Sequence, residues 1–126
     1  MREIRFKFWN RELRKMSKAY GLGVIWESLC EEWGIFDWAD VDKLQFTNFK
    51  DNFDKEVYGG DRCEITVNDY YSDANLTLED GDVFRGIVKM IDYMWVVQDT
   101  DKTEIPLYNI LCDEMDIKVI GNICEK

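Results

Sequence analysis

The feature that most constrains this chain is a pair of apolar runs in its C-terminal half, Val83–Ile91 and Tyr93–Gln98. Both runs are rich in β-branched and aromatic residues, so they predict the two strands of a β-hairpin. Apolar side chains fall on both faces of each strand, and we expect a second layer or another subunit to cover them. Gly86, inside the first strand, predicts a bulge or a sharp bend of the kind that small barrels need.

Other segments also have the pattern of strands. Apolar and basic residues alternate along Glu3–Trp9, which is the two-residue period of a strand, and Lys15–Tyr20 follows a polar turn as its hairpin partner. Three later segments are also expected to be strands: Arg62–Val67, Ile105–Leu111 and Asp116–Cys124. Ile105–Leu111 contains the only proline, Pro106, and is expected to be an edge strand.

One segment, Val24–Asp42, departs from the β pattern. Between Trp26 and Trp33 apolar residues recur at spacings of three and four, which predicts one short amphipathic helix. Trp33, Phe36 and Trp38 then form an aromatic cluster flanked by acidic residues. Burial of this cluster under the sheet is favoured, and exposure as a partner contact is the alternative, because aromatic residues are enriched where partners bind.

The central stretch Leu44–Asp61 is expected to form a strand, a polar loop, a short strand and a Gly-Gly-Asp turn. Gly60 supplies the backbone freedom that the turn needs, and Asp61 can accept hydrogen bonds from nearby N–H groups. A second structural turn is expected at Gly121 and Asn122. The tip of the polar loop contributes further candidate partner contacts, namely Lys50, Asp51 and Phe53.

The charge of the chain is strongly uneven. Residues 1–18 hold seven basic and two acidic residues, a balance of +5, so the rest of a chain of net charge −10 carries −15. An acidic body repels phosphate backbones, so general nucleic-acid binding is not expected, although basic and aromatic residues interleave in the first strand. The acidic surface serves solubility, or alternatively it binds a basic partner by imitating nucleic acid.

The sequence gives no sign of a reaction centre. The four cysteines, at positions 30, 63, 112 and 124, form no close pair and the chain has no histidine, which argues against a zinc site. An EF-hand loop beginning at Asp73 fails because Leu78 stands where that loop requires glycine, so Asn68–Asp82 is expected to be an exposed acidic loop. We therefore expect a protein that is not an enzyme and that uses no cofactor or metal.

Neither a signal peptide nor a membrane-spanning run is evident. The expected location is the cytoplasm, with reduced thiols and no membrane association.

Three motifs in the same order, MREIRFKFWNRELRKM, LQFTNFKDNFDKEVYGGD and KVIGNIC, resemble the YopX family of phage and prophage proteins. The corresponding family patterns are MREI-K-F-R-x-W-D, QYTGLKD-x-NGKEIYEGD and EVIGNI. The chain departs from them at several positions, since Asn10 replaces Asp, Asn48 and Phe49 replace a Gly-Leu pair, and Phe53 and Asp54 replace an Asn-Gly turn. The central loop is therefore expected to be built differently here.

The resemblance implies a β-rich fold with a small Src-homology-3-like barrel and self-assembly, and it supplies no catalytic residues. We therefore expect one mainly β domain over residues 1–126, with an N-terminal hairpin and aromatic insertion in 1–43 and the barrel in 44–126. The expected function is that of a non-catalytic phage or prophage accessory protein that forms a homo-oligomer in the bacterial host cell. The alternative is an acidic inhibitor of a basic host nucleic-acid-binding or defence protein.

Overall fold

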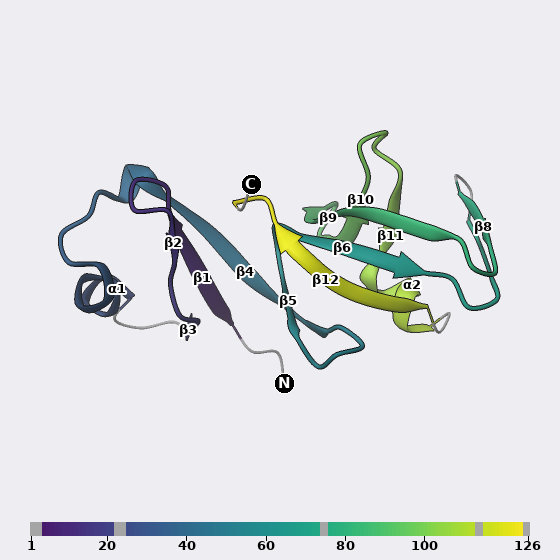
Figure 1. The fold of residues 1–126 in the computed structure, drawn as a ribbon, viewed down its shortest axis with the longest axis horizontal. Helices are drawn as coiled ribbons and strands as arrows, with labels where there is room; N and C mark the ends of the chain where they lie inside the picture. The colour runs from purple at the N-terminus through teal and green to yellow at the C-terminus, as the bar shows by residue number, and fades with distance from the viewer. Residues whose placement is uncertain (1–3, 22–24, 74–75, 113–114, 125–126) are drawn as a thin grey trace.

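The computed structural model describes residues 4–21, 25–73, 76–112 and 115–124. The fold is mainly β, as predicted, and two sheets lie side by side along the long axis of the molecule (Figure 1). We call residues 4–43 the N-terminal part and residues 44–124 the C-terminal part. The C-terminal sheet is curled into a half-barrel.

The first sheet has the antiparallel order β2-β1-β4-β5, and β3 also pairs with β1. Its strands are β1 (Arg5–Asn10), β2 (Lys15–Met16), β3 (Tyr20–Gly21), β4 (Val41–Lys50) and β5 (Glu56–Tyr58). The predicted N-terminal hairpin is confirmed, with the returning segment divided into the short strands β2 and β3. The predicted start of the first strand, Glu3, lies outside the described residues.

The predicted helix is α1 (Ile25–Trp33), which covers the outer end of the first sheet (Figure 1). The helix ends at Gly34, whose φ of +77° is readily adopted by glycine and whose N–H donates to the carbonyl of Cys30 at 2.8 Å. A 3-10 turn, η1 (Trp38–Asp40), then leads into β4. Leu29 on α1 packs with Phe8 of β1 in a small core.

The second sheet has the antiparallel order β11-β10-β9-β6-β12, and a separate hairpin pairs β7 with β8. Its strands and those of the hairpin are β6 (Asp61–Thr66), β7 (Tyr70–Ser72), β8 (Thr77–Glu79), β9 (Val83–Ile91), β10 (Met94–Gln98), β11 (Glu104–Pro106) and β12 (Asp116–Asn122). The predicted hairpin of the two apolar runs is β9 and β10. Inner-face residues of this sheet form the larger core, which includes Ile65, Val88, Val97 and Ile105.

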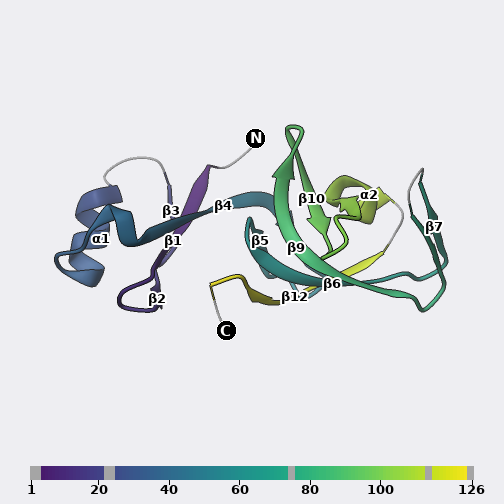
Figure 2. The same ribbon diagram turned by 90° about the horizontal axis from the view of Figure 1, so that it is seen from above.

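Strand β9 is what curls the sheet. Its first half pairs with β6 and its second half with β10, so that Ile87 is opposite both Arg62 and Gln98. Figure 2 shows the strong curvature that results. Of the two predictions for Gly86, the bend is confirmed. The bulge is not observed, because β9 pairs with β6 and β10 without a shift in register. A Cβ at Gly86 would lie 2.6 Å from the carbonyl oxygen of Gln98, so glycine permits this close approach.

The structure corrects two sequence-based expectations. The predicted edge strand Ile105–Leu111 ends at Pro106, and the chain continues as a second helix, α2 (Leu107–Cys112), which contacts β10 and β11. Proline suits the start of a helix, and the buried residues Leu107 and Ile110 have helical spacing.

The second correction concerns Asn68–Asp82, which was expected to be an exposed acidic loop. Most of it forms the hairpin of β7 and β8, in which Tyr71 is opposite Leu78. Tyr71 is buried in the larger core and Leu78 packs against it, because alternation places one face of the hairpin inward. The described acidic side chains of the segment are exposed as expected. Asn75, part of the rejected EF-hand pattern, lies outside the described residues.

Candidate functional site

The aromatic cluster is a stack of edge-to-face rings at the α1 end of the molecule. The ring centroids of Trp33 and Phe36 are 5.3 Å apart at 89°, and those of Phe36 and Trp38 are 5.4 Å apart at 78°. Trp38 also meets the Phe8 ring of β1 edge-on, at 5.9 Å. Such ring pairs add stability beyond the burial of apolar area. The sheet, the helix and the 3-10 turn therefore hold these rings in fixed positions.

The cluster is both core and surface. Phe36 is buried, Trp33 is half-buried, and Trp38 keeps 39% of its surface exposed. The neighbouring Ile35 is fully exposed. The expectation of burial therefore holds for Phe36, while the alternative of an exposed contact describes Trp38.

The loop between β4 and β5 has a structural centre, the carboxylate of Asp51. This side chain is only 7% exposed. Its Oδ1 accepts the N–H groups of Phe53 at 2.8 Å and Lys55 at 2.9 Å, and its Oδ2 accepts that of Val119 on β12 at 3.0 Å. Burial opposes ionisation, but the N–H donors of Val119, Lys55 and Phe53, together with the nearby charge of Lys55, hold the pKa of Asp51 below its usual value. Asp51 therefore ties the loop to the sheet.

Asn52 covers the free edge of β12. Its backbone N–H donates to the carbonyl of Ile117 at 3.0 Å, and its side-chain Oδ1 accepts the N–H of Ile117 at 2.6 Å. Because an unpaired strand edge can pair with another chain, this loop protects the sheet against edge-to-edge association.

The tip of the same loop faces solvent. Phe53 is 71% exposed, and Lys118 Nζ lies 5.5 Å from the centre of its ring. Lys50 pairs with Asp54 at 3.4 Å, with both side chains exposed. Of the predicted contacts in this loop, Lys50 and Phe53 are accessible and Asp51 is held inside.

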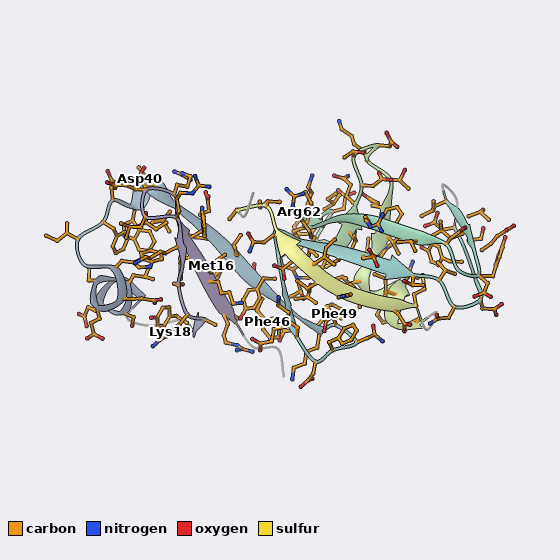
Figure 3. All side chains as sticks on the ribbon, in the orientation of Figure 1. Met16, Lys18, Asp40, Phe46, Phe49 and Arg62 are labelled. Atoms are coloured by element: carbon orange, nitrogen blue, oxygen red, sulfur yellow. The ribbon has the colours of Figure 1, made fainter. Side chains whose placement is uncertain are left out.

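The two sets of candidate contacts do not form one surface. Trp33, Phe36 and Trp38 lie around α1 and η1, whereas the loop with Lys50 and Phe53 lies beside β12, and the two places are well separated in both views (Figures 1 and 2). Figure 3 shows the same separation between Asp40, in η1, and Phe49, near the loop. The two sets are close in the sequence, but the length of β4 separates them in the fold.

The predicted turn at Gly60 and Asp61 connects the two sheets, since β5 belongs to the first and β6 to the second. Gly60 has a φ of +91°, its N–H donates to the carbonyl of Val88 at 2.9 Å, and its carbonyl accepts the N–H of Ile123 at 2.8 Å. Asp61 Oδ2 accepts the N–H of Tyr58 at 2.8 Å. The turn therefore joins β5, β9 and the C-terminal segment, which explains why it needs glycine.

The second predicted turn lies close by. A bulge between Val119 and Gly121 interrupts the pairing of β12 with β6, and Asn122 is opposite Asp61. Asn122 Oδ1 accepts the N–H of Cys124 at 2.8 Å, so its side chain fixes the end of β12.

The described residues offer little for covalent or metal chemistry. Burial, followed by the charges of Asp61 and Asp51, raises the pKa of the Cys63 thiol to about 12, so this thiol stays protonated near neutral pH. Throughout 4–21, 25–73, 76–112 and 115–124, no group of three or more Cys, Asp or Glu side chains is arranged to hold a metal ion. In the same ranges, no helix has the length and apolarity needed to cross a membrane.

A further site is not evident from the sequence. A pocket of about 410 Å³ on the outer face of the C-terminal sheet is lined by four cationic side chains, those of Arg62, Arg85, Lys89 and Lys102. They come from β6, β9 and the turn after β10, so they are scattered along an acidic chain. The only local signal is the alternation of Arg85, Ile87 and Lys89, which places all three on one face of β9.

The fold and these surfaces define a small, mainly β protein with a curled half-barrel sheet and an aromatic N-terminal extension. A scan against protein-family models finds no match, and neither does a search of curated proteins. The resemblance to the YopX family therefore stays a prediction.

Proposed function

We propose that this chain is a non-catalytic accessory protein of the phage or prophage type, resembling the YopX family, and that it acts in the host cytoplasm through protein contacts. Its first partner is a second copy of itself. The half-barrel is proposed to be of the Src-homology-3-like kind. One observation carries the proposal: Trp38 and Ile35 present apolar surface from a rigid aromatic stack at the end of the molecule.

The charge pattern around this end supports pairing between copies. Arg14 in the turn after β1 and Lys15 at the start of β2 are exposed and basic, whereas Glu27 and Glu31 on α1 are exposed and acidic. A two-fold interface is self-complementary, so the acidic helix of one copy can meet the basic turn of the other around Trp38. We name Ile35, Trp38 and these charged residues the aromatic end.

Sedimentation or light scattering at micromolar concentration tests this proposal. The diagnostic variant is Ile35→Asn, since Ile35 is fully exposed and its replacement leaves the stack intact. Tyr93→Asn is a matched control, because Tyr93 is equally exposed in the distant turn between β9 and β10, where asparagine tolerates the left-handed backbone (φ +64°).

We expect oligomers for the native chain and for Tyr93→Asn, and a shift to monomer for Ile35→Asn. A native chain that is monomeric throughout this range, or two variants that behave alike, would contradict the proposal.

The alternative function is inhibition of a basic host nucleic-acid-binding or defence protein. It is favoured by the hairpin of β7 and β8, which stands at the far end of the C-terminal part (Figure 2). Asp69, Glu79 and Asp80 lie exposed on or beside this hairpin. A compact group of carboxylates in an acidic chain attracts basic surfaces and repels competing DNA.

Displacement of a purified bacterial nucleoid protein from duplex DNA measures this activity. The triple variant D69N/E79Q/D80N should lose it, whereas E12Q/E27Q/E31Q, with the same change of charge at the other end, should keep it. Displacement that is absent, that both variants retain, or that is insensitive to salt counts against the alternative.

A further inference from the structure

The pocket on the outer face of the C-terminal sheet has a regular construction. Ile87 forms its floor, with Arg85 and Lys89 two positions before and after it on the same face of β9. Arg62 is opposite Ile87 on β6, and Gln98 is opposite it on β10. Neighbours of this kind lie about 5–8 Å apart, within the reach of long side chains. Three cations from two adjacent strands therefore surround one apolar residue.

Both arginines are anchored in a way that leaves their outer nitrogens available to a ligand. Arg62 donates through Nε to the carbonyl of Asn122 at 3.4 Å, and Arg85 donates through Nε to Glu64 at 2.9 Å. A guanidinium held by Nε still has two Nη groups, which match the paired oxygens of a phosphate. Figure 3 shows Arg62 at the start of β6, beside the turn that connects the two sheets.

The fourth cation comes from a turn that is itself held in shape. Lys102 and Thr100 belong to the turn between β10 and β11 and line the pocket. The turn is fixed by Asp99, whose Oδ1 accepts the N–H groups of Asp101 at 3.0 Å and Thr103 at 2.9 Å. The one acidic residue that lines the pocket thus directs an oxygen to the backbone of its own turn, which lowers its competition for the cations.

Four cations line one concavity and repel one another, and the ion pair of Arg85 with Glu64 offsets only part of this repulsion. A bound anion relieves it. The volume of about 410 Å³ lies within the range of small-molecule sites. A long polyanion is disfavoured, because beyond the pocket it meets an acidic body, including Glu64 and Asp101 nearby.

We infer that this pocket, lined by Arg62, Arg85, Lys89 and Lys102, is a binding site for a small phosphorylated molecule of about the size of a nucleotide. The two arginines bind its phosphate oxygens, Lys89 and Lys102 neutralise the remaining charge, and the apolar surfaces of Ile87 and Ile120 contact its non-phosphate portion. This site shares no residue with the aromatic end, so the inference does not depend on self-association.

Calorimetric titration of the full chain with pyrophosphate and with ADP, at low salt, tests the inference. The diagnostic variant is K89Q/K102Q, which spares the arginines that brace the strands. Loss of two charge-assisted contacts should weaken binding by roughly 10-fold or more. The control K18Q/K43Q removes the same charge at exposed lysines outside both the pocket and the aromatic end, and it should retain nearly native affinity.

Three further measurements separate this ligand from others. Amide NMR signals of Gly86, Ile87 and Thr100 should shift on addition of ADP, since these residues line the pocket. Citrate should bind more weakly than pyrophosphate, and a long oligothymidine more weakly than ADP.

Several outcomes would overturn the inference: no binding of either phosphate probe, equal weakening in both double variants, shifts confined to another surface, or tighter binding of citrate or oligothymidine.

Discussion

The two parts of this protein solve the same problem, covering one face of an antiparallel sheet, in different ways. The C-terminal part curls β9 so that its sheet encloses a continuous core, in which Ile65, Val97 and Ile105 are fully buried. The N-terminal part covers its end of the first sheet with α1 and a few large rings instead. Its core of Phe8, Leu29 and Phe36 is small. The C-terminal part therefore has the larger buried core, whereas the N-terminal part depends on a few large side chains for its stability.

The two parts are joined by β4. Its first half pairs with β1 and its second half with β5, with a register shift between Phe46 and Phe49. Phe46, Leu44 and Tyr58 form a third small core at this junction. Arg5 of β1 also bonds to Glu56 of β5, so β4, this small core and an ion pair together couple the two parts. Four predictions test how strongly the two parts depend on each other.

The largest effects are expected from cavities in the two cores. Ile65→Ala and Leu29→Ala each empty a fully buried site, which costs about 2–5 kcal/mol of unfolding free energy. We expect Ile65→Ala to lower the stability of the whole chain, and Leu29→Ala to open mainly the N-terminal part. Hydrogen exchange resolved by segment measures both.

The amides of β6 and β9 report the difference between these variants. They should stay protected in Leu29→Ala and lose protection in Ile65→Ala. Equal loss of protection in both variants would mean that the two parts unfold as one unit.

A second prediction compares close packing in the two parts. Gly86→Ala would place a Cβ 2.6 Å from the backbone carbonyl oxygen of Gln98, so β9 and β10 must separate. We expect a loss of about 1–3 kcal/mol, measured by urea unfolding. Gly21→Ala is the control in β3, where the nearest atom is 3.8 Å away, and it should change stability little. An unchanged Gly86→Ala would show that the curled sheet has room to adjust.

A third prediction concerns the loop that seals β12. Asp51→Asn replaces one carboxylate oxygen by an amide group that cannot accept a backbone N–H, and we expect a loss of about 1–2 kcal/mol at neutral pH. Because the pKa of Asp51 is lowered in the folded chain, its contribution is complete above the usual pKa of an unfolded Asp. The contribution is lost as the pH falls through the lower, folded value.

The native chain should therefore lose more stability between neutral and acidic pH than Asp51→Asn does. Asp54→Asn, which alters an exposed carboxylate of the same loop, should follow the native pH profile. Identical profiles for all three proteins would show that Asp51 does not contribute to the pH dependence of stability.

The smallest effect is expected at the surface of the N-terminal part. Arg11 bonds to Asp42 and to the carbonyl of Ala39, but the Arg11 and Asp42 side chains are both more than 40% exposed. A double-mutant cycle with Arg11→Gln and Asp42→Asn should give a coupling of about 0.2–1 kcal/mol that falls with added salt. A larger, salt-independent coupling would show that the N-terminal part depends on ion pairs more than on its aromatic rings.

Local patterns in the sequence predicted most of the elements. The alternation in β1, the apolar runs of β9 and β10, the spacing around Leu29 and the glycine turn at Gly60 were each identified correctly. The sequence predicts a longer strand after Pro106 and a loop around Tyr71, and the structure has a helix and a hairpin at these places. Both errors have the same cause. A short segment fits the pattern of a strand, a helix or a loop equally well, and only its contacts with neighbouring elements decide between them.

Periodicity, turn chemistry and charge are local properties, so the sequence is enough to predict a mainly β protein, the places of its principal turns and an acidic body. The three-dimensional arrangement of the strands buries Asp51 and exposes Phe53, and it leaves the aromatic cluster partly in the core and partly on the surface. It also gathered Arg62, Arg85, Lys89 and Lys102 around Ile87. These outcomes depend on which strands become neighbours, and the curvature of β9 sets that arrangement for residues far apart in the chain.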